Sequence, residues 1–251
     1  MNILITGNRG FIGGHLSKYL KDKGHNIIGI DRKDGNEVLD INEDTLKDID
    51  IIIHLAAQTS VWNTNIELIE NDNIKSFIHI FNLCKKLNKR FIYASSSCSI
   101  NITSMYGLSK YFDDLYFEIY KWDKCIGLRF HNVYGKDSRE DTLLGICLNN
   151  SEITLYNNGL NYRHFTYIDD VCKSIEMSFN LKSCIYNVFN PQENSVLEFV
   201  NEVLKYKDLK INLIDSIREL DKEKQLIDDT KINLIENNYK NIKIGINEIF
   251  R

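Results

Sequence analysis

Short apolar runs alternate with longer amphipathic segments along the first 130 residues of this chain. The runs predict buried strands at residues 1–6, 26–31, 38–41, 50–55, 90–94 and 125–130. Between them, apolar positions recur at helical spacing and predict helices at residues 11–23, 66–87 and 106–122. Because strands and helices alternate, we expect an α/β fold with a doubly wound parallel sheet.

The pattern becomes less regular after residue 135, although residues 183–187 predict one further strand. With 251 residues, 43% of them hydrophobic, the chain can bury the core of one domain with a small second lobe. No linker separates the two, so the lobes are expected to interleave. We assign residues 1–135 and about 164–190 to the sheet domain, and about 136–163 and 191–251 to a small α/β lobe.

Charge and cysteine usage exclude several classes of function. The net charge is −4 and no long basic block occurs, so nucleic acid is not an expected partner. No apolar run reaches membrane-spanning length and the N-terminus does not read as a signal peptide, which predicts a cytoplasmic protein with no membrane partner. The six cysteines are scattered without ligand-like spacing, which predicts reduced thiols and no metal site.

A glycine-rich turn joins the first predicted strand to the first predicted helix. Gly7, Gly10 and Gly13 recur at three-residue spacing, which suits a tight turn and close approach of a pyrophosphate to the helix N-terminus. About 20 residues later, Asp31 closes the second strand, where a carboxylate can bond the ribose hydroxyls of an adenosine. Together these residues predict a dinucleotide site.

The residues after the second strand bear on which dinucleotide binds. Asp31 favours NAD because its carboxylate repels a 2′-phosphate, whereas the adjacent Arg32 either offsets that repulsion or is simply a solvated loop cation. NADP is therefore not excluded. Asp40 and Ile41 either flank the adenine or merely end the predicted strand at 38–41, and both alternatives stay open.

Candidate catalytic residues follow the fifth predicted strand. Lys110 comes four residues after Tyr106, so on a helix both face the same way, and a nearby ammonium lowers the pKa of a phenol towards general-base work. Ser95, Ser96 and Ser97 follow the strand at its carboxyl end, where such sheets bind ligands. We favour Ser97 as the hydroxyl that bonds the substrate oxygen, with Ser95 and Ser96 as alternatives.

These motifs resemble the extended short-chain dehydrogenase/reductase family, in particular its nucleotide-sugar epimerase and dehydratase branch. Residues 6–13 match its TGxxGFIG loop, residues 54–58 its HLAAQ segment, and Tyr106 with Lys110 its YxxxK pair. Residues 128–135 are similar to LRxxNVYG and residues 163–171 to RDFxYVDDV. Arg218 with Asp221, and residues 229–231, resemble two late segments of the family. The likeness covers nearly the whole chain.

The resemblance implies a Rossmann domain that binds NAD and a small C-terminal α/β lobe that binds a nucleotide-diphosphate sugar. It implies Ser97, Tyr106 and Lys110 as catalytic residues, and Ser97, Asn132, Arg163 and Arg218 as substrate contacts. The candidate cofactor-binding residues are Gly7, Arg9, Gly10, Phe11, Ile12, Gly13, Asp31, Arg32, Asp40, Ile41, Leu55, Ala56, Ala57, Tyr106 and Lys110.

The implied activity is epimerisation of a nucleotide-sugar, with C4 oxidised and reduced again through a 4-keto intermediate. An NAD(P)H-dependent nucleotide-4-keto-sugar reductase uses the same residues, and a non-catalytic NAD(H)-binding protein is a third hypothesis. Cys98 and Ser99 replace the Asp-Glu pair with which the dehydratase branch expels water, which argues against a 4,6-dehydratase.

A homodimer is a further expectation from the family. The helices predicted at 66–87 and 106–122 would pair with their copies, with Tyr111, Phe112, Tyr116 and Phe117 as exposed aromatic contacts.

Overall fold

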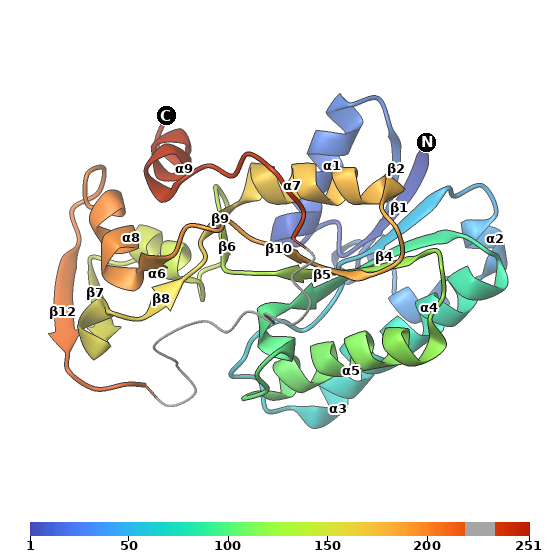
Figure 1. Cartoon of the computed structure of the whole chain (residues 1–251), viewed down its shortest axis with the longest axis horizontal. Helices are drawn as coiled ribbons and strands as arrows, with labels where there is room; N and C mark the ends of the chain where they lie inside the picture. The colour runs from blue at the N-terminus through green and yellow to red at the C-terminus, as the bar shows by residue number, and fades with distance from the viewer. Residues whose placement is uncertain (219–233) are drawn as a thin grey trace.

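The computed structural model describes residues 1–218 and 234–251. Its centre is a parallel sheet ordered β10-β5-β4-β3-β1-β2 (Figure 1). The strands are β1 (Asn2–Thr6), β2 (Asn26–Ile30), β3 (Ile51–His54), β4 (Arg90–Ser96), β5 (Cys125–Phe130) and β10 (Ile185–Val188). The doubly wound sheet predicted from the apolar runs is confirmed, including the late strand near residue 185.

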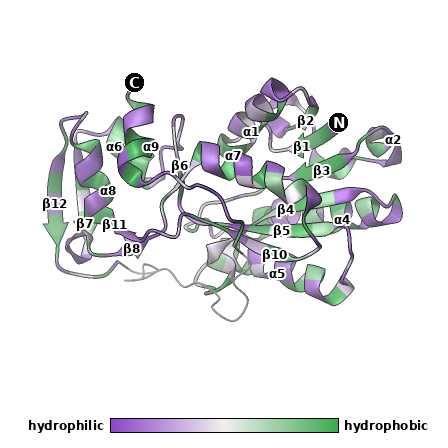
Figure 2. Cartoon of the chain, turned by 45° about the horizontal axis from the view of Figure 1, so that its top comes forward, coloured by the Kyte–Doolittle hydropathy of each residue, from purple (hydrophilic) through white to green (hydrophobic). Residues whose placement is uncertain are grey.

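Helices cover both faces of this sheet. Helices α1 (Phe11–Asp22) and α7 (Ile168–Met177) lie on one face, and α4 (Ser76–Lys86) and α5 (Met105–Tyr120) on the other (Figure 1). Successive side chains of a strand point to opposite faces, so Ile3 and Ile5 pack in one buried cluster and Leu4 in the other. Figure 2 shows the strands of the sheet mostly in the hydrophobic colour.

The strand predicted at residues 38–41 is wrong. Val38–Asp40 forms a short 3-10 helix, and another spans Arg32–Asp34. Asn42 then caps α2 (Glu43–Leu46), and its side chain and that of Thr45 form a reciprocal capping box. The segment between β2 and β3 is too short to hold a further parallel strand with its crossovers, since one crossover usually takes a dozen residues or more.

On the same face as α4 and α5, α3 (Ile66–Ile69) and a π-helical segment (Glu70–Lys75) run directly into α4. The helix predicted at 66–87 is therefore present, with one irregular stretch inside it.

The smaller lobe lies at one end of the sheet domain (Figure 1). Strands β7 (Glu152–Tyr156) and β12 (Lys210–Ile214) pair in parallel beside α6 (Leu143–Asn149), α8 (Val196–Val203) and α9 (Ile242–Ile249). Short pairs, β8 (Tyr162–Arg163) with β11 (Asn194–Ser195) and β6 (Val133–Tyr134) with β9 (Thr166–Tyr167), connect it to the sheet domain. One buried cluster runs from Ile3 of β1 to Phe199 of α8, so the two parts share a core.

The order of the strands fixes where a ligand can bind. The chain moves from β1 to β2 on one side and then from β3 to β4 on the other, so the crossover direction changes between β1 and β3. In open α/β sheets the crevice at the carboxyl ends of the strands beside such a point is the ligand site. Within the described residues, no helix has the length and apolar character needed to cross a membrane.

Candidate functional site

A cavity of about 610 Å³ opens at this point of the sheet. The glycine turn, the segments that follow β3 and β4, and residues of the smaller lobe form its walls. Of the residues predicted to bind cofactor or substrate, fourteen line it: Gly7, Gly10, Phe11, Ile12, Gly13, Asp31, Arg32, Leu55, Ala56, Ala57, Ser97, Tyr106, Lys110 and Asn132.

The glycine turn has no room for side chains. Gly7 has a φ of +73°, in the left-handed region that favours glycine. A Cβ atom on Gly13 would lie 2.1 Å from the carbonyl oxygen of Gly7, and one on Gly7 would lie 2.8 Å from the backbone nitrogen of Ala56. This cradle of bare backbone in front of α1 fits the pyrophosphate of a dinucleotide.

Asp31 is oriented at the far end of the turn. Its carboxylate accepts hydrogen bonds from the backbone amides of Arg9, at 2.9 Å, and Lys33, at 3.0 Å. The side chain also lines the cavity, where it can reach the ribose hydroxyls of an adenosine. The turn and Asp31 together have the shape and chemistry that NAD requires.

The neighbouring Arg32 is held by two carboxylates. Its guanidinium donates to both oxygens of Asp72, at 2.7 and 2.9 Å, and to Glu37 at 3.1 Å. Gln58 donates to the same Asp72 at 2.7 Å. Arg32 is therefore half-exposed, but two carboxylates compensate its charge, so it does not offset a 2′-phosphate, and this favours NAD over NADP.

Five predicted residues do not line the cavity: Arg9, Asp40, Ile41, Arg163 and Arg218. Ile41 is buried in the core under α4, and because residues 38–40 curl into a 3-10 helix, Val38 and Leu39 line the cavity instead. The guanidinium of Arg9 pairs with Asp34 at 3.1 Å, so this residue meets the site only through its backbone amide.

Arg163 and Arg218, two of the predicted substrate contacts, have other surroundings. Arg163 lies on β8. Burial raises the pKa of the Cys98 thiol, and the positive charge of Arg163 partly opposes that rise. Arg218 stacks on the indole of Trp62, with its guanidinium carbon 4.2 Å from the ring centroid. Asp221 and residues 229–231 lie outside the described residues.

Tyr106 and Lys110 lie on one face of α5, which begins after its cap, Ser104. Burial raises the pKa of Tyr106 above the usual value of a phenol, while Lys110 opposes that rise. The Lys110 ammonium therefore lowers the pKa of Tyr106, as predicted, but burial raises that pKa by more.

The Ser96 hydroxyl has a hydrogen bond that lowers the pKa of Tyr106, and the favoured Ser97 is the next residue of the chain. Its hydroxyl oxygen accepts from the backbone amide of Cys98 at 3.2 Å, which leaves the hydroxyl proton for another acceptor. Ser96 is the last residue of β4, and the chain turns into a 3-10 helix at Ser97. Both serines line the cavity.

Sequence reasoning missed several residues of the cavity wall, notably Arg139, Cys98 and Thr142. The charge of Arg139 lowers the pKa of Tyr106, and its guanidinium contacts Thr59 and pairs with Asp141 at 2.9 Å. Arg139 follows the NVYG segment by four residues, and no recognisable motif marks it.

The buried histidines do not line the cavity. Burial, with Lys110 nearby, lowers the pKa of His54 to about 3, and its ring contacts the Thr6 hydroxyl at 2.7 Å. Burial likewise lowers the pKa of His131 to about 3. Among the described residues, no cluster of His, Cys, Asp or Glu could hold a metal ion.

Comparison with known proteins agrees with this geometry. The chain is 32% identical to the protein CapI of Staphylococcus aureus, covering 70% of this chain and 68% of that one. It is 28% identical to a putative UDP-glucose 4-epimerase of Methanocaldococcus jannaschii, covering 82% of each.

The fold is also that of solved structures. The UDP-glucuronic acid 4-epimerase from Bacillus cereus, in complex with UDP-glucuronic acid and NAD, superposes with a TM-score of 0.84 at 23% identity, covering 100% of this chain and 98% of that one. TunA, an NAD-dependent NDP-hexosamine 5,6-dehydratase, superposes with a TM-score of 0.86 at 23% identity, covering 99% and 96%.

The family whose description matches the chain covers most of the sheet domain. It spans residues 3–188, from β1 to the end of β10. The chain belongs to the NAD dependent epimerase/dehydratase family, and is an enzyme of the extended short-chain dehydrogenase/reductase type.

Proposed function

We propose that this chain is an NAD-dependent epimerase of a nucleotide-diphosphate sugar. The observation that carries the proposal is the meeting of Tyr106, Lys110 and Ser96 in one cavity with the glycine turn and Asp31. The named activity of the Methanocaldococcus relative supports it. A non-catalytic NAD(H)-binding protein would not need this set of groups at the end of its cofactor site.

Each group has a distinct role in the proposed reaction. The glycine turn would hold the pyrophosphate of NAD, Asp31 the adenosine ribose and Lys110 the nicotinamide ribose. When bound, the nicotinamide accepts and returns a hydride. Tyr106, as phenolate, takes the proton of the sugar 4-hydroxyl, and Ser96 donates a hydrogen bond to the same oxygen.

The substrate is then held while the 4-keto sugar turns over. Asn132 lies at the bend between β5 and β6 with a φ of +32°, and its side chain lines the cavity. We assign it to the nucleotide-sugar, together with Arg139 in the cavity wall and with Arg163 and Arg218. Arg139 is added to the predicted set because its charge acts on Tyr106.

The test starts with the dinucleotide that copurifies with the protein, released by denaturation and identified by mass. We expect NAD near one equivalent, and C4-epimer formation from a panel of UDP-sugars, followed by NMR, without net change in NADH. An empty protein that consumes NAD(P)H with a 4-keto sugar and forms no epimer would instead establish the reductase. Tight binding of NADPH in particular would contradict the assignment of the Arg32 ion pairs to NAD preference.

We also propose that two copies pair through α5. Leu108, Tyr111, Leu115 and Ile119 recur at helical spacing and are 42%, 42%, 44% and 69% exposed, so they form an apolar stripe on its outer face. Phe112 and Tyr116 are half-buried beside it. Phe117, predicted as an exposed contact, is buried against Tyr93 instead, because it lies on the inner face of the helix.

Substituting Ile119→Glu should convert the dimer to a monomer, since it places a charge at the most exposed position of this stripe. Light scattering coupled to size exclusion measures the mass directly. Ile244→Glu is the matched control, because Ile244 is 46% exposed on α9 of the smaller lobe. A wild-type monomer, or an Ile119→Glu variant that stays dimeric, would exclude this interface.

A further inference from the structure

Lys110 forms an ion pair that is almost completely buried. Its ammonium lies 3.0 Å from Oδ2 of Asp113, and the two side chains are 3% and 0% exposed. Oδ1 of Asp113 has no hydrogen-bond partner within the described residues. A buried pair with an unsatisfied oxygen contributes little to stability, so its effect is best sought on the groups around it.

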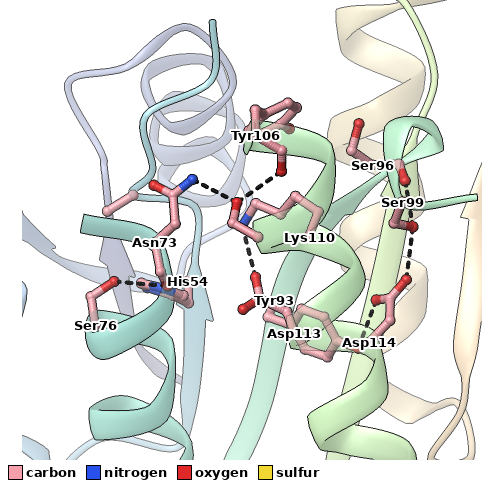
Figure 3. Close-up of polar contacts among 12 residues, drawn as sticks. His54, Asn73, Ser76, Tyr93, Ser96, Ser99, Tyr106, Lys110, Asp113 and Asp114 are labelled. Atoms are coloured by element: carbon pink, nitrogen blue, oxygen red, sulfur yellow. Dashed lines mark hydrogen bonds and ion pairs between the residues drawn. The ribbon is translucent and has the colours of Figure 1, made fainter. Parts of the chain in front are cut away.

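The adjacent carboxylate, Asp114, has a different set of partners. It accepts from Tyr93 at 3.0 Å and Ser99 at 2.9 Å (Figure 3). It also accepts from Arg129 at 2.8 Å. These bonds tie α5 to β4, to β5 and to the turn after β4. Asp114 is thus occupied with holding the helix in place, whereas the hydrogen bond of Asp113 goes to Lys110.

Tyr106, Lys110 and Asp113 follow one another along the inner face of α5, at helical spacing. The phenol and the ammonium line the cavity, and Asp113 lies at the buried end of the row (Figure 3). A lysine without contact with water normally loses its proton, since burial disfavours the charged form by up to about 3–5 pKa units. The ammonium of Lys110 therefore needs a nearby negative charge.

We propose that Asp113 is the positioning residue that keeps Lys110 protonated and fixed in the dry wall of the cavity, so that a positive charge faces Tyr106. The inference rests on the proposed function only in taking Tyr106 as the base. Burial lowers the pKa of Lys110, and Asp113 is the group that raises it most. Burial raises the pKa of Asp113 itself to about 7, so the charged pair forms as the pH rises through neutrality.

The other titratable groups around the pair do not replace Asp113. From β3, His54 is neutral because burial lowers its pKa to about 3. From β4, burial raises the pKa of Tyr93 well above its usual value, so its phenol stays protonated. Asp114 of the same helix pairs with Arg129 of β5, and its charge also raises the pKa of Lys110, but less than that of Asp113 does. Cys98 and Arg139 act on the pKa of Tyr106 itself.

The experiment is a titration of the Tyr106 phenolate by its ultraviolet absorbance, in the protein without substrate, with Tyr106→Phe as the background. We expect Asp113→Asn to raise the apparent pKa of Tyr106 by about one unit or more, because Lys110 then loses its proton first. Glu118→Gln removes the same charge from an exposed position of α5 and should leave the titration unchanged.

A second pair of variants covers the case in which Asp113→Asn does not fold. One variant is Lys110→Gln, and the other combines Lys110→Gln with Asp113→Asn. Both lack the positive charge of Lys110, and the double variant leaves no unpaired buried charge. In that background, loss of Asp113 should no longer raise the pKa of Tyr106. An unchanged or lowered pKa of Tyr106 in Asp113→Asn overturns the proposal. So does an equal rise in the pKa of Tyr106 when Asp113→Asn is added to Lys110→Gln. Because no turnover is measured, failure of the epimerase assignment would not affect this result.

Discussion

Replacing Tyr106 by Phe should abolish turnover of a nucleotide-sugar while leaving NAD bound. The substitution keeps the ring that lies in the cavity wall and removes only the hydroxyl that we propose as the general base. General acid–base groups contribute about 10²- to 10⁴-fold, so we expect kcat to fall by at least about 100-fold with a small change in KM. NMR of the C4 epimer measures the rate, and mass analysis of the released dinucleotide measures NAD.

The matched control is Tyr116→Phe, since Tyr116 lies on the same helix and its hydroxyl donates to Asn82 at 3.2 Å on the exposed side. It should retain wild-type activity. Burial raises the pKa of Tyr106, so the active phenolate form grows as the pH rises, and the rate should increase towards alkaline pH. If Tyr106→Phe keeps more than about a tenth of the activity, another group is the base, because one pKa-matched base accounts for more than that.

The sheet could be predicted because each of its strands is a short apolar run next to a helix of clear periodicity. The exception at residues 38–41 shows the limit of that reasoning. A run such as Val38 to Ile41 looks like a strand, but the capping box of Asn42 and Thr45 begins a helix immediately after it. The length available between β2 and β3 decided the outcome, rather than the side chains in the run.

The choice of the candidate catalytic serine shows a second limit. Three consecutive serines follow β4, and the sequence alone cannot tell which one faces Tyr106. Side chains alternate along a strand, and the strand ends at Ser96, so the choice depends on where the backbone turns. A hydrogen bond of Ser96 acts on Tyr106, and the favoured Ser97 lines the same cavity, so the choice between the two serines stays a prediction.

Contacts between distant segments lie beyond any local pattern. The partner of Arg32 is Asp72, forty residues away in the sequence, and Gln58 bonds the same carboxylate. No spacing rule predicts this network, although it bears directly on the choice between NAD and NADP. The Tyr106–Lys110 pair could be predicted because both residues lie on one helix, whereas the pairing of Asp113 with Lys110 depends on the burial of both side chains, which the spacing alone does not give.

Gly13→Ala should disrupt both the dinucleotide site and the stability of the sheet domain. The new methyl group would lie 2.1 Å from the carbonyl oxygen of Gly7 and 2.9 Å from the Cα of Asn8, which are backbone atoms of the turn itself. Overpacking of this kind costs about 1–3 kcal/mol, and the turn that would hold the pyrophosphate has to move. We expect a lower melting temperature and NAD binding weakened by about 10- to 100-fold in a titration.

Gly14→Ala is the control that isolates the turn from the helix. At this exposed position the nearest atom to a Cβ is the carbonyl oxygen of Asn8 at 3.8 Å, which is ordinary contact. Alanine in a helix is favoured over glycine by about 0.5–1 kcal/mol, so this variant should be slightly more stable than wild type and bind NAD equally well. Normal NAD affinity in Gly13→Ala would show that the turn is not the pyrophosphate site. The two variants add the same methyl group to adjacent residues of α1. Their difference in melting temperature and NAD affinity therefore gives the effect of crowding the backbone of the turn, separately from any effect on the helix.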